Sequence, residues 1–294
     1  MKKNSKISKS HKVFSIVSFI IIGLYSLSLL LPLFWALSSI FKTSLEFPRN
    51  IMGLPREWTI ENITGAFKIL KADVETTTGT RSVYAAEMLM NSLIYALGCT
   101  IVTTFAQLSV AYCVAKFKFF LKKIIYGIVI VMMLLPIVGA LPSSIQMSRM
   151  VGTYDSIVGI FLMSYTFGGM HFLILYATYQ GIPNDYAEAA QIDGASHFAV
   201  FFKIMIPLGM ASITAVAILL FITYWNDYYT PMIYLPSMPT IAYGLFRFSV
   251  SPENSNSVPV QLTGCLMVSL PIIILFLVFK NKIMGNVMVG GLKG

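Results

Sequence analysis

The sequence predicts an all-α membrane protein with six transmembrane helices. Hydrophobic residues make up 56% of the 294-residue chain and charged residues only 11%, whereas soluble domains carry about 25% charged residues. The apolar residues are concentrated in six long runs, and the mean hydropathy is +0.76. Most Lys and Arg residues lie in alternate connections between these runs. Together these observations argue against an ordinary soluble enzyme, a disordered protein or a coiled coil.

Each of the six runs is long enough to cross a bilayer, which takes about 20 residues of α-helix. The first run is much longer than the roughly 7–15 apolar residues of a signal peptide, so we expect it to be retained as a span. Prolines in several runs predict kinks, which a membrane helix tolerates when its neighbours satisfy the freed carbonyls. The expected spans are residues 13–41, 88–115, 124–145, 157–180, 208–235 and 260–280. The prolines are Pro32, Pro136, Pro142, Pro231 and Pro271.

Six spans place both ends of the chain on one side of the membrane. With the N-terminus inside, the inner segments hold 13 of the 21 Lys and Arg residues but only 3 of the 12 Asp and Glu residues. Cytoplasmic segments of membrane proteins carry such an excess of basic residues. The sequence therefore predicts an N-in, C-in topology with a cytoplasmic tail at 1–12, a membrane domain at 13–280 and a second cytoplasmic tail at 281–294. The largest outer loop, 42–87, is too short for a substantial separate domain.

No pattern typical of a catalytic or metal site occurs in the sequence. It lacks the phosphate-binding loop G-x-x-x-x-G-K-[ST], the zinc motif H-E-x-x-H and the nucleophile motif G-x-S-x-G. The three cysteines lie inside apolar runs without metal-ligand spacing. The inner loops explain the net charge of +9, and no basic-aromatic pattern typical of nucleic-acid binding accompanies it. We therefore expect no catalytic residue, no metal, no cofactor and no nucleic-acid partner.

The segment 182–207, between the fourth and fifth spans, differs from the other inner segments because it carries a single Lys. Pro183 can end the fourth helix. Asp185 and Glu188 have the spacing of a capping box, which predicts that a new helix begins near Asp185. The new helix is rich in alanine, which favours helix formation and whose small side chain allows another protein to approach the helix closely. Its alanines are Ala187, Ala189 and Ala190.

The same segment predicts a sharp turn followed by a second helix. Gly194 suits the left-handed position that follows a helix end. Ser196 can cap a second helix, which Pro207 is expected to break where the fifth span begins. A short exposed helix with a small-residue surface suits docking into the cleft of a partner protein. A simple connector at the membrane surface is the alternative interpretation.

A motif in this segment resembles the EAA motif of permease subunits of ABC importers. The family pattern is EAA, three residues, G, nine residues and I-x-L-P. Here Glu188-Ala189-Ala190 is followed at the same spacing by Gly194 and by Ile204-x-Ile206-Pro207, with Ile206 where Leu is usual. The run EAAQIDGAS, the stretch YWND at 224–227 and the tail VGGLKG at 289–294 are similar to the carbohydrate-uptake, maltose-type branch of this family.

The resemblance implies a fold, a set of partners and a transport function. It implies the type I importer permease fold, in which the loop between spans four and five forms a coupling helix. That helix sits on a cytoplasmic ATPase dimer, so ATP hydrolysis comes from another chain. The other implied partners are a second six-span permease, an extracytoplasmic solute-binding protein, a carbohydrate solute and membrane lipid. The implied location is the bacterial cytoplasmic (inner) membrane.

By the same resemblance, six residues are expected to contact the ATPase. Glu188 is expected to cap the coupling helix and to meet a basic residue of the ATPase. Gly194 is expected to form the turn, and Asp193 to cap the second helix or to contact the ATPase. The full set is Glu188, Ala189, Ala190, Asp193, Gly194 and Ala195.

Polar side chains inside the spans are candidates for the solute pathway. These are His171 in span four, Gln107 in span two, and Asn226 with Asp227 near the outer end of span five. For each of them an interhelical hydrogen bond is the alternative role.

Two alternative functions stay open on the sequence. The solute of an ABC importer could be a non-sugar compound such as a polyol phosphate, although no Lys or Arg lies in the middle of a span to meet a phosphate. A transporter driven by an ion gradient is the second alternative. Such a transporter needs carboxylates in mid-membrane, and Asp227 is the only acid clearly inside an apolar run. A membrane-embedded enzyme would need a catalytic set that the sequence lacks.

Overall fold

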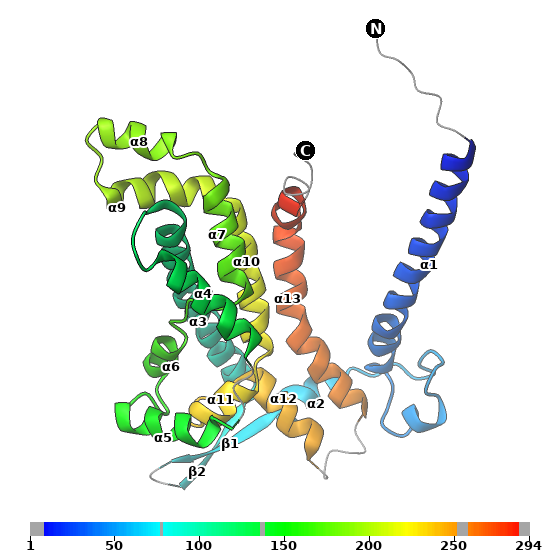
Figure 1. Cartoon of the computed structure of the whole chain (residues 1–294). Helices are drawn as coiled ribbons and strands as arrows, with labels where there is room; N and C mark the ends of the chain where they lie inside the picture. Colours follow the sequence, from blue (N-terminus) through cyan, green and yellow to red (C-terminus); the bar gives the residue numbers. More distant parts are fainter. Residues whose placement is uncertain (1–8, 77–78, 136–138, 252–257, 288–294) are drawn as a thin grey trace. The chain divides into compact units, whose positions relative to one another are not determined.

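The computed structural model describes residues 9–76, 79–135, 139–251 and 258–287. The described chain is predominantly helical (Figure 1). Its internal contacts divide it into two compact units. One unit comprises Met1–Phe67 and Ser251–Leu266, and the other comprises Lys68–Val250 and Met267–Gly294.

Four helical stretches are long and apolar enough to cross a membrane. They correspond to the expected spans one, two, five and six. Val13–Ser39 belongs to α1 (Lys9–Ser39), Ala85–Lys116 is α3, and Val258–Phe279 belongs to α13 (Val258–Val287). The fourth stretch, His197–Asn226, joins α9 (His197–Val200), the π-helical turn η2 (Phe201–Met205) and α10 (Ile206–Asn226). Pro32 and Pro271 lie inside α1 and α13, as the sequence predicted.

The third expected span is not one continuous helix. It is divided into α4 (Lys122–Leu134) and α5 (Leu141–Val151). With 13 residues, α4 is about 20 Å long, which is less than the roughly 30 Å of a bilayer core. Pro142 lies in the first turn of α5, where a missing N–H costs nothing, and Pro136 lies outside the described residues.

The fourth and fifth expected spans are also broken. The fourth consists of α6 (Ile157–Met163) and α7 (Met170–Gly181), separated by the non-helical residues 164–169. Gly169 has a φ of +102°, a conformation that an α-helix cannot contain. In the fifth, α10 ends at Asn226 and the short helix α11 (Tyr229–Tyr234) follows. The apolar runs of the sequence thus identified these segments, but they did not reveal the breaks in the helices.

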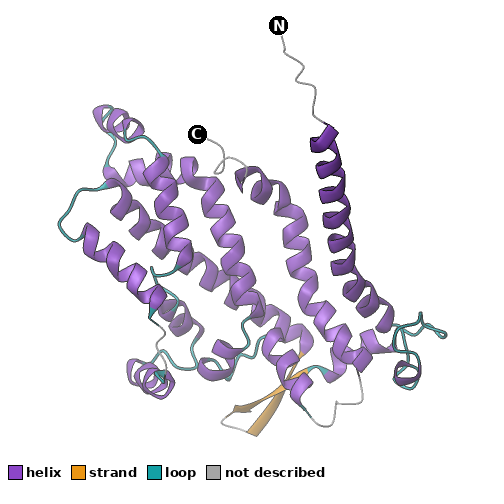
Figure 2. Cartoon of the chain, turned by 45° about the vertical axis from the view of Figure 1, so that its right-hand side comes forward, coloured by secondary structure: helices purple, strands orange, loops and turns teal. Residues whose placement is uncertain are grey.

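The segment 42–87, which the sequence analysis expects to be an outer loop, contains a β-hairpin that the all-α prediction omits. β1 (Lys71–Thr76) pairs antiparallel with β2 (Gly79–Tyr84), with Ala72 opposite Val83 (Figure 2). Both of these side chains are buried, as expected for one face of a hairpin packed against other elements. One neighbour is α12 (Ile241–Val250), which packs beside β1.

In the first unit, two buried polar side chains organise the loop after α1. The Lys42 Nζ donates hydrogen bonds to the carbonyls of Asn50 (2.7 Å) and Ile51 (3.0 Å). The Asn62 amide of α2 (Glu61–Ile69) donates to the carbonyls of Ile40 and Lys42. Beside the short 3₁₀-helix η1 (Phe47–Arg49), hydrogen bonds from the Arg56 backbone N–H and the Asn50 amide lower the pKa of the Glu46 carboxyl.

In the second unit, α3 is the central helix. It packs along α7 and α10, and the three helices enclose the main apolar core together with η2 (Figure 1). Tyr112 of α3 contacts Tyr179 of α7 and Phe201 of η2, with ring centroids 5.4 and 4.8 Å apart. This core lies directly under the segment that connects α7 to α10.

Candidate functional site

The segment between α7 and α10 contains the short helix that the sequence predicted. This helix is α8 (Asp185–Ile192), and none of its residues is buried. α8 and α9 lie together at one end of the second unit, beyond the ends of α3 and α7 (Figure 1). Their position leaves most of the α8 surface open.

The start of α8 differs in detail from the predicted capping box. Asn184, not Asp185, is the N-cap residue, and it makes no capping hydrogen bond with its side chain. Its backbone is already helical (φ −71°, ψ −22°), whereas side-chain capping requires an extended N-cap. Asp185 and Glu188 both lie in the first turn, where their negative charge is favoured by the helix dipole. Glu188 therefore does not act as a cap.

The turn after α8 is a Schellman motif, and it requires the predicted glycine. Gly194 has a φ of +85°. Its N–H donates to the carbonyl of Gln191 (3.0 Å), and the Ala195 N–H donates to that of Ala190 (2.9 Å). Asp193 is the C-cap residue of α8, so its predicted role as cap of the second helix is wrong. Ser196 fills that role, because its Oγ accepts from the Ala199 N–H as predicted.

The second helix does not end at Pro207. Helical structure continues from His197 to Asn226, and Pro207 lies in the first turn of α10. The π-helical turn η2 immediately precedes this proline and widens the helix there. The wider turn explains how the chain passes a residue that lacks an N–H without breaking.

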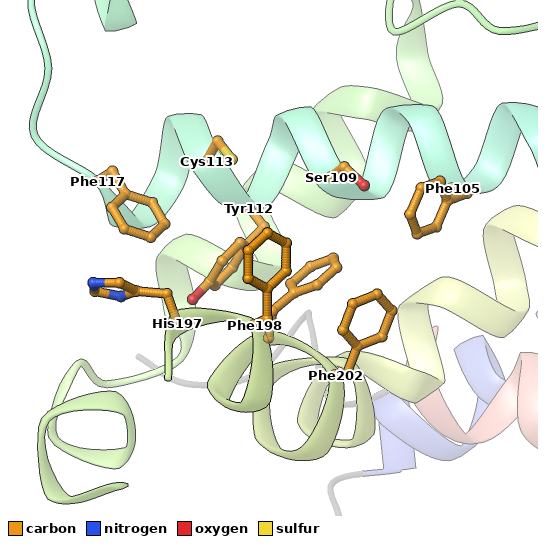
Figure 3. A pocket seen from close by; sticks show the side chains of 9 residues that line it. Phe105, Ser109, Tyr112, Cys113, Phe117, His197, Phe198 and Phe202 are labelled. Atoms are coloured by element: carbon orange, nitrogen blue, oxygen red, sulfur yellow. The ribbon is translucent and has the colours of Figure 1, made fainter. Parts of the chain in front are cut away.

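The helix after the turn packs against the end of α3 through aromatic side chains. The rings of His197 and Phe117 lie 5.7 Å apart. Figure 3 shows Phe198 and Phe202 facing the Tyr112 side of α3 across an apolar cavity of about 260 Å³. The cavity is lined by Phe105, Ser109, Tyr112, Cys113, Phe117, His197, Phe198, Phe201 and Phe202.

The predicted ATPase-contacting residues fall into two groups. Glu188, Ala189, Asp193 and Gly194 are exposed. Ala190 and Ala195 are half-buried and pack, with Ala187, against the core beneath. The second group therefore seats the helix on the protein, while the first group faces outward.

Two exposed apolar side chains of α8 escaped the sequence analysis. Tyr186 is 52% exposed and Ile192 is 85% exposed. Together with Ala189 they recur at intervals of three residues, so they occupy neighbouring positions on the outer surface of the helix. Large apolar residues on a short helix between two spans were the sequence signal that could have identified this exposed apolar surface.

A row of polar side chains along α3 lies against the breaks in the fourth and fifth spans. Tyr95, Cys99, Thr103 and Gln107 recur every four residues, so they share one face of the helix. We call these four residues the polar stripe. Cys99, Thr103 and Gln107 contact the break between α6 and α7, and Tyr95 contacts the break after α10.

At the first break, the stripe satisfies carbonyls that are freed from helical pairing. The Thr103 hydroxyl donates to the Ser164 carbonyl (2.8 Å). The Gln107 amide donates to the Gly168 carbonyl (3.1 Å). The Ser164 carbonyl also accepts from the Thr166 N–H (2.8 Å). Because a carbonyl left unpaired inside a bilayer costs several kcal/mol, these bonds help to make the break tolerable.

At the second break, the partner is a carboxylate. The Tyr95 hydroxyl donates to one oxygen of Asp227 (2.9 Å). The other oxygen accepts from the backbone N–H groups of Tyr229 (2.9 Å) and Thr230 (3.0 Å), which open α11. Asp227 is therefore the C-cap residue of α10, and its carboxylate accepts hydrogen bonds from the first two N–H groups of α11.

The four pathway candidates do not converge on one site. Gln107 is one end of the polar stripe, whereas Asp227 binds Tyr95 at the other end, about 18 Å away along α3. Asn226 is exposed and its amide donates within its own helix to the Ile222 carbonyl. His171 is half-buried in the first turn of α7, directly after the first break. In the described part of the chain, no three His, Cys, Asp or Glu side chains are grouped to hold a metal ion.

The chain is similar in sequence to known transport proteins. The sequence pattern of the family described as "Binding-protein-dependent transport system inner membrane component" matches residues 107–281. The chain is 27% identical to the arabinooligosaccharides transport system permease protein of Bacillus subtilis, over 98% of this chain and 99% of that one. It is 24% identical to the diacetylchitobiose uptake system permease protein of Streptomyces coelicolor, over 96% and 90% of the two chains.

A solved structure shares the fold. It belongs to a bacterial ABC transporter involved in the import of the acidic polysaccharide alginate. The TM-score is 0.75 at 19% sequence identity, over 95% of this chain and 99% of that one. Because the family pattern covers more than half of the sequence, the chain belongs to the family of inner-membrane components of binding-protein-dependent transport systems.

Proposed function

We propose that the chain is the permease subunit of an ATP-driven importer of sugars or oligosaccharides in the bacterial inner membrane. The observation that best supports this proposal is that the binding-protein-dependent transport family matches residues 107–281 of the chain. The relatives described above are named for arabinooligosaccharides and diacetylchitobiose. The solved neighbour belongs to an importer of a polysaccharide. This chain would form half of the translocation pathway, with a second six-span permease forming the other half.

The proposed topology has six crossings with both ends of the chain in the cytoplasm. Four long apolar helices support four of the crossings. The remaining two crossings would be made by the segments that contain α4 and the α6–α7 pair, with the polar stripe satisfying the interruption between α6 and α7. Residues 1–12 and 281–294 would be the cytoplasmic tails of a membrane domain at 13–280.

In this proposal α8 is the coupling helix. It would dock into a cleft of the cytoplasmic ATPase dimer through its outward residues, with Tyr186 and Ile192 as apolar anchors. The exposed acids Asp185, Glu188 and Asp193 favour a cleft that carries Lys or Arg. An exposed helix seated on the core by its alanines can transmit a rigid-body push without bending.

The pathway candidates take different roles in this proposal. We assign Gln107 and Asp227 to the interhelical hydrogen bonds that they form. His171 is the pathway candidate that we retain, because it is half-buried beside the α6–α7 break and its ring forms no hydrogen bond with any residue that the structure describes. A solute-binding protein would deliver the sugar on the outer side.

The test is uptake by the complete system. The tagged chain is purified from its native membrane in a mild detergent, and the co-purifying chains are identified by mass spectrometry. The complex and its solute-binding protein are then reconstituted in vesicles that contain ATP. Uptake of a panel of radiolabelled sugars, including diacetylchitobiose and arabinotriose, is compared with that of glycerol phosphate.

We expect a phosphate-loop ATPase and a second six-span chain in the purified complex, and sugar uptake that stops without ATP. Uptake of glycerol phosphate alone would assign the importer to a polyol phosphate. A chain that purifies alone and drives uptake that a protonophore abolishes would replace the proposal with a gradient-driven transporter.

A further inference from the structure

Lys116, the last residue of α3, links two parts of the candidate coupling segment. Its Nζ donates to the Ile182 carbonyl, and also to the side-chain carbonyl of Asn184 (2.9 Å). Ile182 is the C-cap residue of α7, and Asn184 is the N-cap residue of α8. One side chain therefore joins the end of α3 to the point where the chain leaves α7 and enters α8.

Electrostatics favours a cation at this point. Both α3 and α7 end here, and the carbonyl ends of two helix dipoles attract positive charge. The Lys116 side chain is half-buried, so solvent weakens this attraction less than for a fully exposed lysine. A lysine that serves only to set membrane orientation needs no such partners. The neighbouring Lys118 is exposed and forms no hydrogen bond with a described residue.

The inward contacts of α8 with the core are made by small apolar side chains. α8 packs against α9 and η2, and its inward alanines are Ala187 in the first turn and Ala190 in the second. Pro183 lies between the two residues that Lys116 binds and has no N–H to donate. Lys116 is therefore the side chain whose hydrogen bonds join the entry to α8 directly to α3.

We propose that Lys116 is a positioning residue for coupling: it carries the movement of α8 directly to α3. This inference rests on the proposed function. Through α3 the movement reaches the polar stripe, which binds the breaks in the fourth and fifth spans. A displacement of α8 is thereby transmitted to the two helix breaks, where those spans can bend.

The test is a double-mutant cycle in the reconstituted complex. The variants are Lys116→Met, Asn184→Ala and the double substitution, with Lys118→Met as the matched control. Uptake of the radiolabelled panel sugar that the native complex accumulates is divided by phosphate release from ATP. We expect Lys116→Met to lower this ratio about tenfold, the order expected for losing a hydrogen bond to a charged group.

Non-additive effects of the two substitutions on the uptake-to-hydrolysis ratio would distinguish a positioning role of Lys116 from a general loss of stability. Asn184→Ala removes one of the two acceptors, so a smaller fall is expected, and the double variant should be no worse than Lys116→Met. Lys116→Arg can still donate to both acceptors and should restore most of the ratio. Lys118→Met should leave it unchanged.

Two results would overturn the inference. One is an unchanged uptake-to-hydrolysis ratio in Lys116→Met, or in Asn184→Ala should the first variant fail to insert. The other is independent, additive losses in the cycle. If the ratio stays unchanged while Gly194→Val lowers it, the proposed function stands without the Lys116 link. If uptake by the native complex needs no ATP, the proposed function itself fails.

Discussion

Replacing Gly194 with valine is expected to reduce ATP-driven uptake about tenfold or more while the chain stays inserted in the membrane. The φ of +85° is strained for any residue with a Cβ and most of all for a β-branched one. The strain is about 1–3 kcal/mol, enough to shift most molecules away from the native turn. An added Cβ would meet no atom within 4 Å, so the effect comes from the backbone and not from a collision.

The loss of the turn would misdirect α8 because two of its terminal carbonyls are satisfied there. The uptake of radiolabelled sugar and the hydrolysis of ATP are measured in the same vesicles, with the amount of inserted chain determined by immunoblot. Hydrolysis that continues without uptake is the expected signature of uncoupling. Normal uptake would contradict the role of this turn.

Two controls isolate the cause. Gly194→Asn should keep most of the uptake, because Asn tolerates the left-handed conformation. Gly152→Val introduces the same strain at φ +76°, with open space around its Cβ, at the end of α5. If that variant retains a normal ratio of uptake to hydrolysis, then the defect of Gly194→Val arises from the position of the strain.

Replacing Asp227 with alanine is expected to lower the free energy of unfolding by roughly 3 kcal/mol, since it removes three hydrogen bonds to a carboxylate. The buried Tyr95 hydroxyl would lose its acceptor, and so would the first two backbone N–H groups of α11. The measurement is the unfolding midpoint of the purified chain in detergent. Asn226→Ala is the matched control, because the exposed Asn226 amide binds, among the described residues, only the Ile222 carbonyl of its own helix.

The same pair of variants decides between the two roles that the sequence left open for Asp227. A lower midpoint in Asp227→Ala, with uptake per folded molecule preserved, assigns the residue to the structure. An unchanged midpoint with lost uptake would assign it to the solute pathway and contradict the present assignment.

The sequence predicted local features well where one residue carries the signal. Gly194 and Ser196 each impose their geometry through their own backbone or hydroxyl, so the turn and the cap could be inferred without tertiary structure. The start of α8 near Asp185 was predicted correctly, but the capping box was not, and the Asn184 side chain at the N-cap binds Lys116, which is distant in sequence. A capping rule based on neighbours cannot anticipate such a partner.

The breaks in the spans were missed for a related reason. Residues 164–169 (SYTFGG) carry no charge and lie between apolar segments, so hydropathy averaged over 157–180 records one span. Hydrogen bonds from Thr103 and Gln107 of another helix help to satisfy the carbonyls of this break. The four-residue spacing of the polar stripe is visible in the sequence, but the carbonyls that it serves are not.

The polar stripe also constrains the number of residues in α3. One residue inserted between Cys99 and Thr103 would rotate everything after it by about 100° around the helix axis. Thr103 and Gln107 would then turn away from their carbonyls while Tyr95 kept Asp227. A substitution on this helix removes one hydrogen bond, which another single substitution can restore. A change of register would instead remove the hydrogen bonds of Thr103 and Gln107 together. Its evolution should therefore proceed by exchange of side chains, with insertions and deletions confined to the loops.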